Sequence, residues 1–281
     1  MNDPLVHLNG QLIPLSEACV PVLDRGFIFG DGVYEVIPIY NRKMFRAPQH
    51  MARLLRSLDK VRIANPYTEG QWMKLIQQVV DAYPEDNQMV YLQVTRGVAK
   101  RGHSFPKEVT PTVFIMTNPL ALPSPEMRAA GIVCVTMEDR RWLNCDIKSI
   151  SLLGNVLASQ YATENGAVET VQFRDGFLTE GSSSNIWVVK NGKLLAPPNN
   201  NLILEGIRYG FLQELCESAG IPFEARQITR EEVFDADELL MSSATKEVIA
   251  IVKLDDKVIG NGKPGPVYEK LYRAYQKAKA A

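Results

Sequence analysis

The chain has 281 residues, of which 46% are hydrophobic and 22% charged, and its formal net charge is −1. This length allows one large domain or two modest ones with a buried core. The nearly neutral charge provides no general attraction for nucleic acid or an anionic membrane surface. No stretch reaches membrane-spanning length, the N-terminus lacks the apolar core of a signal peptide, and the four cysteines form no C-x-x-C pair. These features predict a cytoplasmic protein with free thiols, without a nucleic-acid or membrane partner.

The first part of the chain mixes strand and helix patterns. Asn9-Gly10 is a strong signal for a hairpin turn between two short strands. Apolar residues at helical spacing predict helices over 47–63 and 69–83. Strands are predicted at 6–8, 11–14, 33–40, 89–95 and 112–116. This pattern indicates a small N-terminal α/β domain over residues 1–118.

A proline-rich segment follows this first part. Pro119, Pro123 and Pro125 fall within seven residues, and proline is excluded from the interior of a sheet or helix. We therefore predict a linker at 119–125, which would separate a first domain over 1–118 from a larger second domain over 126–281.

The second part again mixes strands and helices. Helices are predicted over 152–165, 205–219 and 266–278. Strands are predicted at 132–137, 170–174, 185–189, 223–228, 238–242, 247–253 and 257–259. Because the order shows no regular βαβ alternation, an α+β fold with largely antiparallel sheets is predicted.

Two residues indicate the chemistry. Lys148 offers an amine that can form a Schiff base, and Glu180, thirty-two residues later, offers a carboxylate that can keep a pyridine nitrogen protonated. A pyridoxal phosphate (PLP) enzyme needs both groups. Either residue alone is usually solvated surface, so the interpretation depends on the motifs around them. The three histidines lack metal-ligand spacing, which argues against a metal site.

Five motifs occur in order along the chain. They are D-R-G-F-I-F-G-D-G-V-Y-E at 24–35, H-M-A-R-L at 50–54, T-R-G and R-G-H within 95–103, C-D-I-K-S at 145–149 and T-E-G-S-S-S-N at 179–185. With these motifs the chain resembles the fold type IV PLP enzymes, and within them the D-amino acid transaminases, over essentially its whole length. The resemblance implies a small N-terminal α/β domain and a larger PLP-binding domain with a largely antiparallel, pseudo-barrel sheet.

The resemblance also implies the cofactor contacts. Lys148 would hold PLP as a Schiff base and later move a proton between the substrate α-carbon and the cofactor. Glu180 would accept a hydrogen bond from the pyridinium N–H, and Arg53 would bind the phosphate. Leu204 would pack on one face of the ring. The remaining contacts implied for the phosphate are Ile207, Ser243, Ala244 and Thr245.

Two positions depart from the family pattern at the phosphate. Arg208 replaces the usual Thr after Ile207, and Ala244 removes a hydroxyl from a turn that is usually S-T-T. Backbone N–H groups at the start of a helix can still bind the phosphate. We therefore expect altered phosphate binding rather than its loss.

Substrate binding is implied at Arg101, His103 and Tyr34. In the family, an R-x-H sequence after T-R-G and a Tyr matching Tyr34 bind the substrate α-carboxylate, for which Arg and His are suitable donors. That loop comes from the neighbouring subunit in these enzymes. The resemblance thus implies a homodimer with shared active sites.

The resulting hypothesis is amino transfer from a D-alanine-like donor to a 2-oxo acid such as 2-oxoglutarate, giving pyruvate and D-glutamate. Alternatives on the same fold are a branched-chain L-amino acid aminotransferase, against which Arg101 and His103 argue, and an aminodeoxychorismate lyase. A non-catalytic PLP-binding protein is a further alternative. The intact Lys148, Glu180 and Arg53 argue against it, because each destabilises the fold if buried without a ligand.

Overall fold

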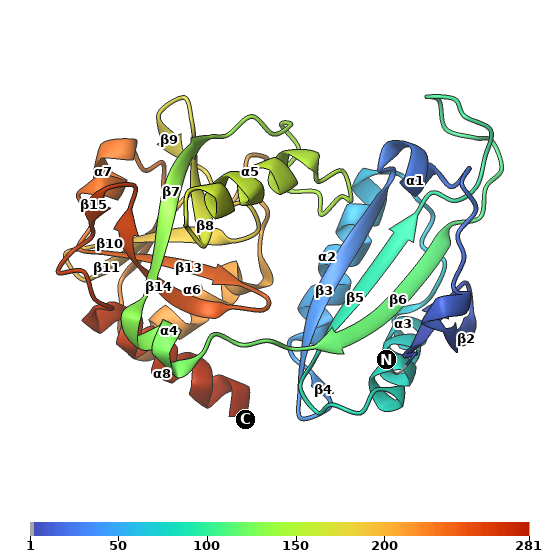
Figure 1. Cartoon of the computed structure of the whole chain (residues 1–281), viewed down its shortest axis with the longest axis horizontal. Helices are drawn as coiled ribbons and strands as arrows, with labels where there is room; N and C mark the ends of the chain where they lie inside the picture. Colours follow the sequence, from blue (N-terminus) through green and yellow to red (C-terminus); the bar gives the residue numbers. More distant parts are fainter. Residues whose placement is uncertain (1–2, 281) are drawn as a thin grey trace. The chain divides into compact units, whose positions relative to one another are not determined.

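The structure is a computed structural model that describes residues 3–280 (Figure 1). These residues form two compact units. Unit 1 comprises the described residues up to Leu120 together with Ile147–Leu152. Unit 2 comprises Ala121–Asp146 together with the described residues from Leu153 onward.

Unit 1 contains a six-stranded sheet of order β2-β1-β6-β5-β3-β4, in which every neighbouring pair is antiparallel. Asn9 and Gly10 have positive φ values of 49° and 92°, which is the backbone geometry that the predicted hairpin turn requires. The strands are β1 (Leu5–Leu8), β2 (Gln11–Pro14), β3 (Gly32–Tyr40), β4 (Lys43–Met44), β5 (Gln88–Thr95) and β6 (Thr112–Pro119). All five strands predicted in this part are present.

Two helices cover one face of this sheet. Helix α2 (Ala47–Lys60) begins with proline in its first turn, and α3 (Glu69–Ala82) begins at a capping box formed by Thr68 and Gln71. The apolar sides of both helices pack against β3, β5 and β6 in one buried cluster, and Figure 1 shows α2 lying along β3. Both predicted helices are therefore confirmed, to within a few residues at their ends.

The segment Ile147–Leu152 belongs to unit 1 through backbone pairing. The amide of Tyr34 donates to the carbonyl of Lys148 (3.0 Å), and the amide of Ile150 donates to the carbonyl of Gly32 (3.1 Å). Ser149 forms an isolated bridge with Val33. The predicted domain boundaries stay a prediction. Lys148 lies within the range 126–281 that was predicted for the second domain, but its backbone pairs with the N-terminal sheet.

The proline-rich segment contains more regular structure than the sequence predicted. Strand β6 runs to Pro119, and the short helix α4 (Pro125–Ala130) begins at Pro125, so the outer two prolines of the predicted linker lie at the ends of regular elements. Both residues occupy the end of an element. A missing N–H disturbs little there, because the end of a strand and the first turn of a helix do not require it.

Unit 2 contains a nine-stranded sheet of order β12-β11-β10-β13-β14-β7-β8-β9, with β15 paired to β14. Three pairs are parallel, namely β11–β12, β14–β7 and β7–β8, and the other pairs are antiparallel. The strands are β7 (Ile132–Glu138), β8 (Glu169–Arg174), β9 (Phe177–Leu178), β10 (Asn185–Lys190), β11 (Lys193–Ala196), β12 (Phe223–Ala225), β13 (Glu238–Ser243), β14 (Glu247–Leu254) and β15 (Lys257–Val258). The predicted α+β class with largely antiparallel sheets is confirmed.

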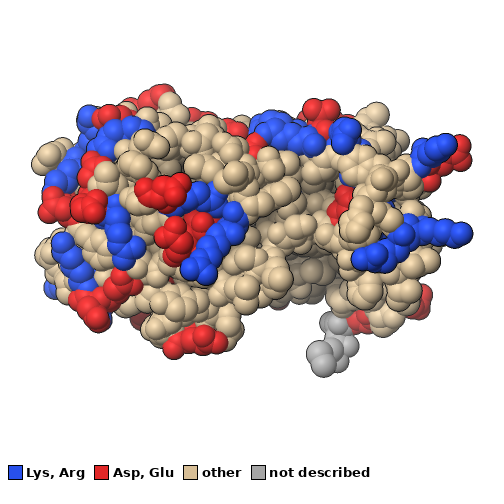
Figure 2. All heavy atoms as spheres, turned by 90° about the horizontal axis from the view of Figure 1, so that it is seen from above, with Lys and Arg blue, Asp and Glu red and all other residues tan. Residues whose placement is uncertain are grey.

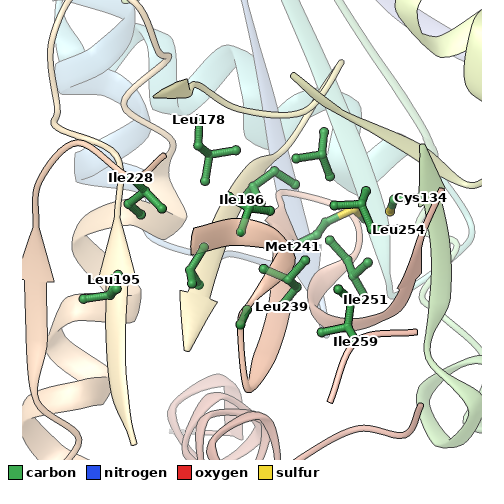
Figure 3. Close-up of a cluster of buried hydrophobic side chains, with 14 of the residues drawn as sticks. Cys134, Leu178, Ile186, Leu195, Ile228, Leu239, Met241, Ile251, Leu254 and Ile259 are labelled. Atoms are coloured by element: carbon green, nitrogen blue, oxygen red, sulfur yellow. The ribbon is translucent and has the colours of Figure 1, made fainter. Parts of the chain in front are cut away.

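The sheet of unit 2 curls around one apolar core. Side chains from β7, β8, β9, β10, β11, β13 and β14 meet in a single buried cluster, part of which Figure 3 shows. Ile186, Leu239, Met241 and Ile251 lie at its centre in that view. The helices of this unit are α4, α5 (Leu153–Glu164), α6 (Ile207–Ala219), α7 (Arg230–Phe234) and α8 (Pro266–Ala280). Helices α6 and α8 pack together, with the rings of Phe211 and Tyr275 5.0 Å apart.

Several short elements were not predicted, among them α1 (Arg25–Phe29), α4 and α7. Each is only one or two turns long, too short for helical periodicity to be visible. Within residues 3–280, no helix is both long and apolar enough to span a bilayer. Figure 2 shows Lys and Arg interspersed with Asp and Glu on the face it presents.

Candidate active site

Lys148 lies beside Tyr34 in unit 1. Its Nζ is 4.0 Å from the centre of the Tyr34 ring, a distance typical of a cation–π contact. Its backbone is fixed on both sides, because its amide donates to Ser57 Oγ (3.3 Å) and its carbonyl accepts from the amide of Tyr34. The amine therefore projects from a firmly held backbone, next to a residue predicted to bind substrate.

Arg53 is oriented by a buried carboxylate. Its Nε and Nη2 donate to the two oxygens of Glu35 (2.7 and 2.8 Å), and His50 Nδ1 lies 2.8 Å from Glu35 Oε2. Burial would raise the pKa of Glu35, but the charge and hydrogen bonds of Arg53 and the bond from His50 outweigh it and lower that pKa to about 2. Glu35 thus stays ionised and holds the guanidinium in a bidentate pair.

Arg101 and His103 gather around Phe29. The guanidinium carbon of Arg101 lies 5.4 Å from the Phe29 ring centre, and the His103 ring lies 5.5 Å from it. Arg25 anchors their loop, because it donates to the carbonyl of Gly102 (2.6 Å) and also pairs with Asp31. Arg101 and His103 are both exposed. Unit 1 brings these two predicted substrate residues together, whereas Tyr34 lies with Lys148.

Glu180 is buried in unit 2 and accepts several hydrogen bonds. Arg141 Nη1 donates to its Oε1, while the amide of Leu204 (3.0 Å) and Asn185 Nδ2 (3.3 Å) donate to its Oε2. Arg141 is itself held by a bidentate bond to Asp139, from its Nε and Nη2 (both 2.9 Å). The carboxylate is therefore fixed in position.

Burial raises the pKa of Glu180 to about 7, although the charge and hydrogen bond of Arg141 and the amide of Leu204 oppose this shift. The nearby charge of Asp139 raises the pKa further, because it offsets part of the positive charge of Arg141. An additional cation beside a carboxyl group with a pKa near neutrality would stabilise its ionised form and lower that pKa. This is the environment expected of a carboxylate that partners a protonated ring nitrogen.

Glu169 fixes the loop that follows Glu180. Its carboxylate accepts from the amide of Ser182 (2.8 Å) and the hydroxyl of Ser184 (2.8 Å). At Gly181 an added Cβ would lie 2.3 Å from Ser184 Oγ, so a larger residue would displace the Ser184 hydroxyl from its bond to Glu169. The T-E-G-S-S-S-N motif thus reflects a tight turn around Glu169, which positions Glu180.

Leu204 and Ile207 lie where the chain enters α6. Asn185 Nδ2 donates to the carbonyl of Leu204 (3.0 Å), and Ile207 is the first residue of α6. The preceding Gly206 packs so closely on Asn185 that an added Cβ would lie 2.1 Å from its Oδ1. No side chain of the described residues caps this helix start. A helix start of this kind is suited to binding an anion.

Ser243, Ala244 and Thr245 lie at the turn between β13 and β14. Ser243 pairs with Glu247 across the strands, and the amide of Lys246 donates to Ser243 Oγ (3.1 Å). Arg208 Nη2 donates to the carbonyl of Ala244 (3.2 Å), which joins this turn to the first turn of α6. Unit 2 therefore gathers the predicted phosphate contacts Ile207, Ser243, Ala244 and Thr245 around these two turns.

Sequence reasoning missed the residues that support the predicted ones. Glu35 appears in the D-G-V-Y-E motif and Arg141 just before C-D-I-K-S, so both stood inside or beside quoted motifs. Asp139 and Glu169 stood in no quoted motif: Asp139 pairs with Arg141 only two residues away, whereas the loop partners of Glu169 lie 13 to 15 residues further along the chain. Across residues 3–280 no cluster of His, Cys, Asp and Glu side chains has the makings of a metal site.

Comparison with known proteins places the chain among aminotransferases. The family model described as amino-transferase class IV matches residues 32–254. The D-alanine aminotransferase of Staphylococcus aureus (strain MSSA476) is 41% identical over 273 residues, covering 97% of this chain and 96% of that protein. The D-alanine aminotransferase of Bacillus licheniformis is 41% identical over 271 residues, covering 96% and 95% respectively.

Solved structures show the same fold. A branched-chain amino acid aminotransferase from Escherichia coli matches with a TM-score of 0.90 at 24% identity, covering 98% of this chain and 94% of that one. A branched-chain aminotransferase from Thermoproteus uzoniensis, solved with norvaline, matches with a TM-score of 0.90 at 27% identity and the same coverage. These likenesses confirm the fold that was expected from the sequence.

Proposed function

Because the chain belongs to the class IV aminotransferase family, whose cofactor is pyridoxal phosphate, we propose that it is a D-amino acid transaminase. The reaction moves the amino group of a D-alanine-like donor to a 2-oxo acid such as 2-oxoglutarate, giving pyruvate and D-glutamate. One observation carries the choice of D-amino acids. Relatives that are 41% identical over nearly the full length are D-alanine aminotransferases, whereas the branched-chain enzymes described above are 24–27% identical.

The residues present fit pyridoxal phosphate. The buried carboxylate of Glu180 suits a protonated pyridine nitrogen, and the uncapped start of α6 at Ile207 suits a phosphate. In unit 1, Arg53, held by Glu35, offers a guanidinium of the kind that binds a phosphate. Leu204 would pack on the ring, and Ser243, Ala244 and Thr245 would complete the phosphate site. When bound, the cofactor supplies an electron sink and carries the amino group between the two half-reactions.

Lys148 performs the proton transfer in this proposal. Its Nζ would take the proton from the substrate α-carbon and later release it, so the amine would act first as a base and then as an acid. Its fixed backbone and the neighbouring Tyr34 ring limit where the amine moves. Glu180 supports this step by favouring positive charge on the ring nitrogen, because an ionised Glu180 is stabilised by a cation.

Arg101 and His103 would bind the substrate α-carboxylate. Both are exposed, and the anchored loop presents them side by side over Phe29. We propose that they act together with Tyr34 of the neighbouring chain in a homodimer with shared active sites. The four cysteines are free thiols, which agrees with the proposed cytoplasmic location.

The visible absorption of the purified protein tests this proposal. The PLP-bound protein is expected to be yellow, and D-alanine is expected to bleach the band while L-alanine, added to a separate sample, leaves it unchanged. Bleaching by L-alanine alone would transfer the proposal to an L-aminotransferase. A band that neither compound affects would favour a lyase, and no band after PLP addition would contradict the cofactor site.

A further inference from the structure

Arg208 occupies a buried position between the two turns assigned to the cofactor phosphate. It lies in the first turn of α6 and is 2% exposed, which is rare for an arginine. Its Nη2 donates to the carbonyl of Ala244, in the turn between β13 and β14 (3.2 Å). Its guanidinium carbon also lies 5.5 Å from the ring centre of Tyr275, on α8. One side chain therefore contacts the helix start, the turn and the C-terminal helix.

The same turn is also held by α8 through Glu247. This residue is fully buried and has a positive φ of 57°, a conformation that a non-glycine residue adopts only when its surroundings impose it. Its carboxylate accepts from Gln276 (2.9 Å) and Lys279 (2.9 Å) on α8, and from Arg128 (2.7 Å). The C-terminal helix thus supports the turn on both sides, through Arg208 with Tyr275 and through Glu247.

This support has a chemical reason. Arg208 and Ala244 stand where the family pattern has hydroxyl side chains, so backbone amides must do more of the binding. A hydroxyl can rotate toward an anion, whereas an amide contributes only if the backbone itself is held in place. The hydrogen bond from Arg208 Nη2 to the carbonyl of Ala244 directs the charge of Arg208 at the turn and fixes the backbone there.

We propose that Arg208 is a positioning residue that tethers the Ser243–Thr245 turn to the start of α6, so that the backbone amides of both turns bind the cofactor phosphate. This inference rests on the proposed function, since it assigns the phosphate of PLP to these two turns. It predicts that loss of Arg208 weakens binding of the phosphate group and leaves binding of the pyridine ring unchanged.

Paired titrations of the cofactor-free protein with PLP and with pyridoxal, which lacks the phosphate, test the inference. The visible band of the lysine-bound cofactor reports both dissociation constants. Arg208→Met keeps the buried stem but removes the donor, and we expect its PLP Kd to rise on the order of tenfold with an unchanged pyridoxal Kd. Arg208→Lys, which keeps a charged donor, is expected to recover most of the PLP affinity. Arg273→Met on the exposed side of α8 is the matched control.

The outcomes separate this inference from the proposed function. An Arg208→Met variant that binds PLP like the wild type, or that loses PLP and pyridoxal affinity equally, would overturn the positioning role. If Arg208→Met does not fold, Arg208→Lys decides alone, because its shorter side chain should donate less well to the Ala244 carbonyl and weaken PLP binding selectively by a few fold. A wild-type protein that forms no band with PLP would instead refute the proposed function.

Discussion

Glu35 in unit 1 and Glu180 in unit 2 are both buried, yet the pKa of Glu35 is lowered to about 2 while that of Glu180 is raised to about 7. Glu35 shares its two oxygens with Arg53 and His50, whose charge and hydrogen bonds outweigh the effect of burial. Glu180 has Arg141, but Arg141 also pairs with Asp139. Equal burial therefore produces opposite pKa shifts, because the net positive charge beside each carboxyl group differs.

This difference in pKa indicates that Glu35 and Glu180 have different roles. A carboxylate that is ionised throughout the neutral range is a fixed counter-ion, suited to holding an arginine in place. A carboxyl group that titrates near neutrality is suited to gain or lose charge as a ligand binds, which is a common property of functional sites. Mutations should therefore affect stability at Glu35 and catalysis at Glu180.

The largest effect is expected at Lys148, whose proton transfer Glu180 is proposed to support. Lys148→Ala should abolish amino transfer, because no other group takes over both the attachment of the cofactor and the proton transfer. Steady-state turnover of D-alanine and 2-oxoglutarate measures this loss. Lys257→Ala, which removes an exposed lysine in unit 2, is the control and should retain activity. Near-native turnover in Lys148→Ala would contradict the assignment.

Glu35→Gln tests the structural side of the comparison. The amide keeps the shape but removes the charge, so the buried guanidinium of Arg53 loses its counter-ion. Removing one partner of a buried ion pair typically costs about 3–5 kcal/mol in the free energy of unfolding. Urea denaturation measures this change, with the exposed Glu108→Gln as a control. A change below about 1 kcal/mol would mean that Glu35 is not the anchor of Arg53.

Glu180→Gln tests the functional side. Turnover should fall on the order of 10²- to 10³-fold, because a neutral amide does not stabilise positive charge on the ring nitrogen. Below about pH 4.5, where the raised pKa of Glu180 does not affect stability, the free energy of unfolding should change little, since Arg141 keeps its pair with Asp139. The exposed Glu217→Gln serves as the control in the same unit. Unchanged turnover with lost stability would reverse the roles assigned to the two glutamates.

Arg101→Ala should act on substrate binding alone. Loss of one charge-assisted hydrogen bond to the α-carboxylate should weaken the binding free energy of D-alanine by about 2 kcal/mol, which corresponds to a roughly 30-fold rise in KM. The neighbouring Lys100→Ala removes the same charge from the same exposed loop and should leave KM nearly unchanged. Equal effects in both variants would indicate general electrostatic attraction instead of a specific contact.

The two pKa shifts should also give opposite dependences of stability on pH in the cofactor-free protein. Between pH 4.5 and about 7, folded Glu180 retains a proton that the unfolded chain has released, so its contribution to stability falls as pH rises. Between about 2 and 4.5, the unfolded chain binds the proton at Glu35, so that contribution is lost as pH falls. Each slope is about 1 kcal/mol per pH unit. Subtracting the Glu180→Gln and Glu35→Gln profiles from the wild-type profile isolates each window, and parallel profiles would contradict the shift concerned.

The sequence predicted the long elements well, because their signals are local. The periodicity of α2 and α3, the Asn9-Gly10 turn and the strands of the first sheet all follow from neighbouring residues. Single-turn helices such as α1 and α7 escaped, since a few residues do not establish a period. The parallel pairs within the second sheet could not be predicted from the sequence, because they depend on contacts between strands that are distant in the chain.

The candidate site was likewise predictable only in part from the sequence. Lys148, Glu180 and Arg53 stood in motifs, but their partners had to come from the fold. Arg141 lies 39 residues from Glu180 in the chain, so no local pattern pairs them. The sequence identified Arg208 as a departure from the family pattern, but only the structure shows that its side chain points to the Ala244 carbonyl. Sequence motifs thus indicate candidate groups, whereas tertiary contacts determine the charge and orientation of those groups.

The placement of Ile147–Leu152 has a consequence for dissecting the protein. Because this short segment packs with unit 1 while the chain on both sides belongs to unit 2, neither unit is a contiguous stretch of polypeptide. A single cut near residue 120 would leave the N-terminal fragment without the backbone partners of Gly32 and Tyr34. It would also separate the Lys148 amine from the Tyr34 ring. A single cut in the polypeptide therefore cannot yield either unit with all of its own residues.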